Sequence, residues 1–254
     1  TSLINTDFSN LNVNKVTNTS HMFSGFLPFT SLNLSSFNTK NVIDMGNMFY
    51  CNCYLTSLNL SNFSTKNVIN MSAMFYGCSG LHFLIIDNFN TENVIEMDHM
   101  FYGVSRVTSL NLSGFNTQKV INMSCMFMYC NSVTSLNLTT FKTKNVQNMN
   151  YMFYLCYTLT SLDLSNFNTE NVLSMEEMFN RCSNLRTLNI SYFNTKKVTN
   201  MKYMFFGCRS LISLNITSFN TQNVVDMQYM FYNCYLLTSL NISNFNTENV
   251  IDMQ

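Results

Sequence analysis

Hydrophobic and polar residues follow one pattern that returns every 26 residues along the chain. In residues 56–81, Leu58 and Leu60 alternate with polar neighbours, which is typical of a β-strand with one buried face. Leucine recurs in phase at Leu32, Leu58, Leu84, Leu110, Leu136, Leu162, Leu188, Leu214 and Leu240. A fixed period of this length predicts a repeat solenoid, in which each coil stacks on its neighbours and the stacked strands pair in parallel.

Beyond the strand the hydrophobic spacing changes to three and four residues. Val68, Met71, Met74 and Phe75 can share one face of a short helix or 3₁₀ segment opposite the strand ladder. Two phenylalanine columns also keep the period. They are Phe37, Phe63, Phe89, Phe115, Phe141, Phe167, Phe193, Phe219, Phe245 and Phe23, Phe49, Phe75, Phe101, Phe127, Phe153, Phe179, Phe205, Phe231. These columns should stack as a continuous core that no coil could form alone.

A threonine occupies the same position in nine coils. The column is Thr39, Thr65, Thr91, Thr117, Thr143, Thr169, Thr195, Thr221 and Thr247. Thr65 is placed to cap the expected helical segment through a hydroxyl that accepts from a backbone N–H two or three residues on. The alternative is a flat, water-ordering threonine ladder, but Lys40 and Glu92 follow directly and would spoil such a face. We therefore expect a structural turn.

Asparagine forms a further column immediately before the threonine in most coils. Its members are Asn38, Asn90, Asn116, Asn168, Asn194, Asn220 and Asn246. Side-chain amides that repeat in register can bond to one another or to the turn backbone, so this column is also interpreted as structural.

Cysteine and histidine show no pattern of a metal or catalytic site. Six of the nine cysteines share a column: Cys78, Cys130, Cys156, Cys182, Cys208 and Cys234. In-register neighbours lie about 4.8 Å apart, beyond the Cβ separation of a relaxed disulfide, which predicts a row of buried thiols. His21, His82 and His99 fall in different columns. We expect no metal, no cofactor and no enzymatic activity.

Charge is sparse and balanced, with 13 basic and 13 acidic residues among 254. A neutral chain lacks the basic surface that nucleic acids require, so we expect no nucleic-acid partner. No apolar run approaches the roughly 18–20 residues of a membrane span, and none is expected in this segment.

The period also predicts the domain organisation. Residues 1–29 should form a degenerate N-terminal coil or cap, because Thr6 replaces the strand leucine and Pro28 interrupts the pattern. Residues 30–254 should form nine 26-residue repeats, the last one incomplete, in a single solenoid domain. An incomplete last coil exposes backbone groups and apolar side chains. Either the native chain continues beyond Gln254 or another subunit docks there, which would be self-association through the C-terminal end.

Eleven Asn-X-Ser/Thr sequons occur, close to the number that chance gives in so Asn-rich a chain. If the source glycosylates asparagine, crowding between neighbouring strands about 4.8 Å apart favours positions outside the strand column. In order of preference the candidates are Asn70, Asn122, Asn18 and Asn62, then Asn33, Asn59, Asn111, Asn137, Asn189, Asn215 and Asn241.

The segment TSLNLSNFSTKNVINMSAMF, residues 56–75, closely resembles the repeats of BspA-like leucine-rich repeat surface proteins. The T-x-N-V-x-x-M-x-x-M-F string recurs in nearly every coil from Leu32 to Gln254. The resemblance implies a leucine-rich-repeat-like solenoid that is extracellular or exposed at the cell surface, with a role in adhesion in some members. It implies no catalytic residue.

Two functions remain open from the sequence. The first is a non-catalytic surface scaffold or adhesin whose polar strand face binds a protein or glycan partner at the cell surface or in the matrix. Its candidate binding face comprises Ser57, Asn59, Ser61, Asn111 and Asn137. The alternative is a structural subunit of an extracellular, glycosylated filament assembled by solenoid stacking.

Overall fold

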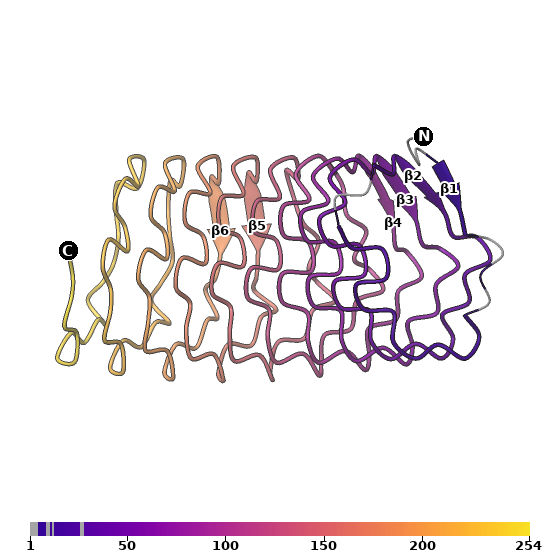
Figure 1. Ribbon diagram of the computed structural model, residues 1–254. Coiled ribbons are helices and arrows are strands. Elements are labelled where there is room, and N and C mark those ends of the chain that lie inside the picture. The colour runs from indigo at the N-terminus through magenta and orange to yellow at the C-terminus, as the bar shows by residue number, and fades with distance from the viewer. Residues whose placement is uncertain (1–4, 9–10, 12, 26–27) are drawn as a thin grey trace.

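The structure, a computed structural model, describes residues 5–8, 11, 13–25 and 28–254. The chain winds as successive coils into one elongated stack, with the first strands at one end and the C-terminus at the other (Figure 1). Short strands lie on one side of the stack. They are β1 (Asn5–Asp7), β2 (Ser31–Asn33), β3 (Ser57–Asn59), β4 (Phe83–Ile85), β5 (Ser161–Asp163) and β6 (Thr187–Asn189).

The strands pair in parallel with an offset of one repeat, as the period predicts. One sheet has the order β1-β2-β3-β4 and a second contains β5 and β6. Leu58 lies opposite Leu84, and Leu162 lies opposite Leu188. The predicted N-terminal coil lies partly outside the described residues, but its strand β1 places Thr6 opposite Leu32. The fold is therefore repeat-solenoid-like, with short parallel strands in sheets.

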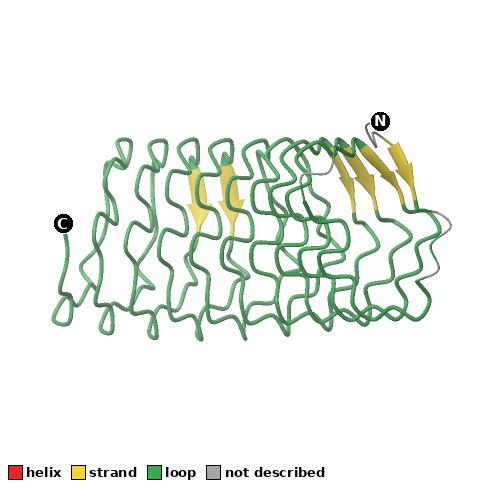
Figure 2. Ribbon diagram, viewed as in Figure 1, coloured by secondary structure: helices red, strands yellow, loops and turns green. Residues whose placement is uncertain are grey.

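The predicted helical segments are wrong. The described residues contain strands and turns and no helix (Figure 2). Accordingly, that part of the chain holds no helix of the length and apolarity needed to cross a bilayer. Between the strands the backbone instead alternates its hydrogen bonds: the Ala73 N–H donates to Asp98 O of the next coil at 2.8 Å, whereas the Tyr76 N–H donates to Ala73 O at 3.1 Å. A helix would direct these donors within its own coil and leave the stack without them.

Left-handed residues make this alternation possible. In nine successive coils the same position has φ between 51° and 58°. The column is His21, Asn47, Ala73, His99, Cys125, Tyr151, Glu177, Tyr203 and Tyr229. For a residue other than glycine this left-handed conformation costs roughly 1–2 kcal/mol. It persists only where the surrounding structure holds the backbone in place. The bonds to the next coil do so here, and the side chains of this column are held on a rigid frame.

A second ladder joins the coils away from the strands. Isolated parallel bridges link Asn18 to Asp44 and continue through every coil to the bridge between Asp226 and Asp252. The stack is thus hydrogen-bonded along more than one line, which restrains each coil against rotation on the next.

Both phenylalanine columns lie in the core, as predicted. Phe153 and Phe179 stack with ring centroids 5.7 Å apart and planes 2° apart. In the other column Phe115 and Phe141 stack at 6.2 Å and 6°. All four are buried. The prediction of ordered apolar rows shared between coils is confirmed.

The threonine column is structural, but its partner is not the one predicted. The Thr65 hydroxyl donates to Asn90 O at 3.0 Å and accepts from the Asn90 N–H at 2.7 Å. The hydroxyl does not cap its own segment, because both of its bonds go to the next coil, and it cannot form a water-ordering ladder, because Thr65 is buried. In-register stacking brings the bend of the next coil, and not the following residues of the same coil, next to this hydroxyl. The Asn90 side chain itself accepts from the Glu92 N–H at 3.0 Å, an Asx-type turn.

The cysteine column holds thiols without disulfides. The Cys78 thiol donates to Phe49 O of the preceding coil at 3.0 Å, and burial raises the pKa of this thiol to about 12. Asn52 stands in the same column one coil earlier, and its amide donates to Phe23 O at 2.6 Å. From Asn52 to Cys234 the column therefore supplies a small hydrogen-bond donor to the preceding coil, except at Val104, whose side chain has no polar atom.

Candidate functional site

The strand face singled out from the sequence is exposed. Ser57, Asn59 and Ser61 all face solvent in and beside β3. The side-chain oxygen of Asn59 accepts from the Ser61 N–H at 3.0 Å, and Asn137 accepts from both the N–H and the hydroxyl of Thr139. Each amide oxygen is thus occupied by its own turn, which reduces the polar groups that this face offers a partner.

The sequons differ in exposure, which the preference based on crowding did not take into account. Asn70 and Asn122 are half-buried, whereas Asn18 and the seven strand-column asparagines are exposed. The Asn62 side-chain nitrogen, the atom that a glycan would occupy, donates to Leu34 O at 2.9 Å and to Phe37 O at 3.3 Å. Asn62 could therefore carry a glycan only after losing these bonds. Crowding along the strand face remains the argument against its own sequons.

Among the described residues, no three His, Cys, Asp or Glu side chains are grouped to hold a metal ion. His99 nevertheless has partners that sequence spacing did not indicate. Its Nδ1 lies 2.9 Å from the Asp98 carboxylate, and its ring lies beside Tyr76 and Tyr102 at about 6 Å. The hydrogen bond that protonated His99 donates to the Asp98 carboxylate, followed by its interaction with Cys125 of the next coil, raises the pKa of His99 to about 9.

This pKa predicts a pH dependence of stability. Because the folded protein holds the His99 proton more tightly than the unfolded chain, the stabilisation is complete below about pH 6.5 and is lost as pH rises through about 9. We expect His99→Asn to flatten this decline, and asparagine suits the left-handed backbone at this position. Urea unfolding of both proteins at pH 6, 7.5 and 9 gives the free energy of unfolding at each pH, and the variant should show the smaller decline of this free energy with rising pH. The titration of the cysteines is common to both proteins and cancels in the comparison. An equal decline of the free energy of unfolding with pH in the two proteins would show that His99 does not contribute to the pH dependence.

Aromatic rings of successive coils, half-buried apart from the exposed Tyr232, contact one another along a further surface that the sequence did not indicate. We call it the aromatic face. It is formed by Tyr50, Tyr76, Tyr102, Tyr129, Tyr151, Tyr154, Tyr203, Phe206, Tyr229 and Tyr232. Tyr151, Tyr203 and Tyr229 stand in the left-handed column, so their position follows from the rigid turns.

The aromatic face consists of two clusters of rings. The first begins with the parallel stack of Tyr50, Tyr76 and Tyr102, whose ring centroids are 4.7 and 4.1 Å apart, and it runs on to Tyr154. The second cluster is made of Tyr203, Phe206, Tyr229 and Tyr232. Within it Tyr203 stacks on Tyr229 at 5.3 Å. One coil without a surface ring separates the two clusters.

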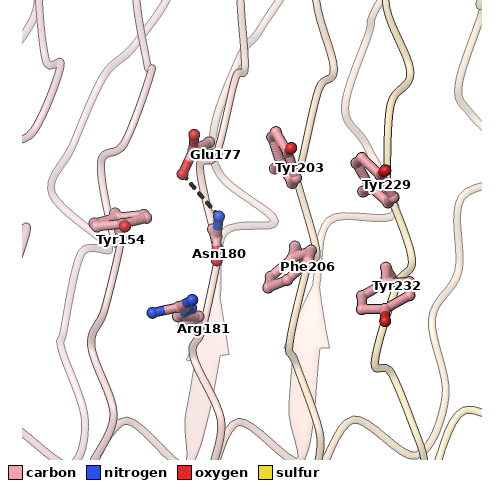
Figure 3. A pocket seen from close by; sticks show the side chains of 8 residues that line it. All are labelled: Tyr154, Glu177, Asn180, Arg181, Tyr203, Phe206, Tyr229 and Tyr232. Carbon is pink, nitrogen blue, oxygen red and sulfur yellow. Dashed lines mark hydrogen bonds between the residues drawn. The ribbon is translucent and has the colours of Figure 1, made fainter. Parts of the chain in front are cut away.

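That intervening coil carries Glu177, Asn180 and Arg181, and an open groove of about 540 Å³ lies over it. Figure 3 shows these three polar side chains between Tyr154 on one side and the second cluster on the other. The volume falls within the usual range of small-ligand sites. The groove is the candidate functional site.

The polar groups of the groove are incompletely paired. The Asn180 amide nitrogen donates to the Glu177 carboxylate at 2.7 Å, while the Asn180 amide oxygen is buried and has no hydrogen-bond partner. Burial raises the pKa of Glu177 above its ordinary value. The Arg181 guanidinium lies over the Phe206 ring at 5.9 Å. The site therefore combines ring surfaces, one carboxylate, one guanidinium and an unused acceptor.

A weak sequence signal for this face existed. Tyrosine follows the core phenylalanine in the M-F-Y strings at Tyr50, Tyr76, Tyr102, Tyr154 and Tyr232, at multiples of the repeat. The helical interpretation of that segment gave no reason to place these rings together on one surface. Only the left-handed turns do so.

A family model described as "Mycoplasma protein of unknown function, DUF285" matches residues 1–85, 52–162, 80–185 and 156–254. No curated protein and no solved structure matches the chain. The four overlapping matches cover the chain from end to end, in keeping with its repeated coils. The chain therefore belongs to the DUF285 family.

Proposed function

We propose that this protein is a non-catalytic, extracellular or cell-surface scaffold of the BspA-like, leucine-rich-repeat-like kind, which binds a protein or glycan partner through its outer side chains. The observation that carries the proposal is the aromatic face with its groove. Tyrosine offers large contact area at low entropic cost and is enriched where proteins bind partners. Tyr203 and Tyr229 stand on the left-handed turns, and Phe206 stacks on Tyr232, so binding would order few side chains.

The absence of catalysis is part of the proposal and is supported by the column cysteines. Each of these six thiols donates to the backbone of the preceding coil. Burial raises the pKa of this thiol in every member, for example Cys156 to about 12. Thiols in this state are poor nucleophiles at neutral pH.

The surface location rests on the resemblance of the repeat string to exported repeat proteins, and the sparse, balanced charge of the chain is compatible with it. The exposed strand columns are mainly Asn, Ser and Thr, and charged residues make up 10% of the chain. Such a surface suits recognition by shape and hydrogen bonds more than by long-range charge.

Binding of the fluorescently labelled protein to cultured host cells, measured by flow cytometry, tests the function. Tyr229→Ser and Tyr232→Ser together should reduce saturable binding at least ten-fold, because both rings lie at the surface of the groove. The matched pair Asn111→Ser and Asn137→Ser changes the strand face and should leave binding intact.

Loss of binding with the asparagine pair alone would instead assign the partner to the strand face. No cell binding by the unaltered protein, together with ordered filaments in electron micrographs, would replace the proposal with the filament alternative.

A further inference from the structure

We propose that the groove over Glu177, Asn180 and Arg181 binds one ring of an uncharged oligosaccharide. This inference rests on the proposed scaffold function and names the ligand class of its site. Four features of the groove support it: an interrupted ring column, apolar ring surfaces, unused acceptors and balanced charge.

The groove exists because one ring is missing from an aromatic column. Asn180 occupies the position at which Tyr154, Phe206 and Tyr232 stand in other coils. Neighbouring coils lie about 4.8 Å apart, so the residues on either side of Asn180 are separated by about 10 Å. A short side chain between two large rings leaves a space into which a ligand ring can descend, as Figure 3 shows.

The walls suit the C–H surface of a pyranose. Tyr203 and Phe206 meet edge to face, with centroids 5.4 Å apart and planes at 73°. This arrangement presents both a ring face and a ring edge towards the groove. Aromatic surfaces of this kind bury the apolar side of an amphipathic ligand and leave its polar groups directed elsewhere.

The polar groups of the groove, at Asn180 and Glu177, can accept hydrogen bonds from a ligand. Asn180 is 5% exposed and its amide oxygen has no partner, which is unfavourable unless a ligand supplies one. The Glu177 carboxylate is a further acceptor, with one bond already taken by the Asn180 amide nitrogen. The Asn180 oxygen faces Arg181 in Figure 3, and because Arg181 is exposed its side chain can move aside and donate to the same ligand. Sugar hydroxyls both donate and accept, so they match all three groups.

The charges around the groove cancel. Glu176 and Glu177 are opposed by Arg181 and Lys202, each of which acts on the Glu177 carboxylate. A phosphate would meet the two carboxylates, and a cationic peptide would meet the arginine and the lysine. An uncharged ligand rich in hydroxyl groups avoids both penalties.

Saturation-transfer NMR on the full chain tests the inference. The probes are cellotriose, maltotriose, lactose and tri-N-acetylchitotriose, with an arginine-rich peptide as the competing class. We expect at least one saccharide to bind with a Kd on the order of 1 mM. Asn180→Tyr restores the missing ring, which the same column accommodates in other coils, and should weaken that binding at least ten-fold.

Met128→Tyr is the matched control. Met128 stands in the same column as Asn180, between Tyr102 and Tyr154, and is also not aromatic. It should leave saccharide binding unchanged. Glu177→Gln should weaken binding about three- to ten-fold through loss of a charge-assisted acceptor.

Unchanged saccharide binding by Asn180→Tyr would overturn the assignment to the groove. Binding of the arginine-rich peptide alone, or of no probe at about 10 mM, would overturn the ligand class. If either result occurs while cell binding is still lost in the Tyr229→Ser and Tyr232→Ser variant, the proposed scaffold function is retained. Loss of all cell binding in the unaltered protein is the separate failure of that function.

Discussion

Replacement of Phe141 by alanine should destabilise the protein by about 3–5 kcal/mol. Phe141 is 2% exposed and stacks between Phe115 and Phe167, with centroids 6.2 and 6.3 Å away. Loss of the ring removes buried apolar surface and leaves a cavity shared by three coils. The rigid coils on either side cannot collapse into it without breaking their own ladders.

Equilibrium urea unfolding followed by circular dichroism measures the effect. The dependence of the free energy of unfolding on urea concentration is compared as well, because repeat proteins can lose cooperativity. Phe83→Ala is the matched control. Phe83 lies in β4 but is 71% exposed, so the same truncation should cost less than about 0.5 kcal/mol. Similar losses in the two variants would contradict the assignment of the column to the core.

The repeat itself predicted the parts of the fold that depend on burial. The alternation at Leu58 and Leu60 predicted one strand face, and the offset of 26 residues predicted its parallel neighbour. Burial of Phe63 and Phe89 followed from the same logic. These features are determined by side chains that every coil must hide, and a sequence reports such side chains directly.

The backbone between the strands could not be predicted in the same way. Met71, Met74 and Phe75 have helical spacing, yet all three are buried by tight turns that place Ala73 in the left-handed region. Glycine would have marked these turns. Glycine does occur at Gly25, Gly77, Gly103 and Gly207, in a second column of positive φ that lies four residues after the first, but it is absent from the first column. Backbone hydrogen bonds between neighbouring coils offset the cost of the left-handed conformation, and the sequence of a single coil does not reveal those bonds.

The aromatic groove depends on this same backbone. Tyr203 and Tyr229 would lie on a polar helix face in the helical interpretation, with no defined relation to Asn180. The left-handed turns align the side chains of successive coils, so a single small residue in a ring column becomes a gap. In the sequence the groove is therefore marked only by a departure from the repeat, at Asn180.

The threonine column gives the second large effect. Thr117→Val should destabilise the protein by about 2–4 kcal/mol, because it leaves two backbone groups of the next coil without their partner. The Thr117 hydroxyl donates to Lys142 O at 3.1 Å and accepts from the Lys142 N–H at 2.8 Å. Valine has nearly the same shape as threonine, so the variant tests the hydroxyl with little change in packing.

Thr117→Ser separates the hydroxyl from the methyl group. Serine keeps both bonds and loses one buried methyl, for an expected cost of about 1 kcal/mol. The loss of unfolding free energy in the valine variant, relative to the unaltered protein, measures the hydrogen bonds, and the loss in the serine variant measures the methyl group. Amide exchange provides an independent reading, since the Lys142 N–H should lose protection in the valine variant and retain it in the serine variant. If valine costs no more than serine, water replaces the hydroxyl at the bend, and the coils are held together by their apolar columns and backbone ladders without help from threonine.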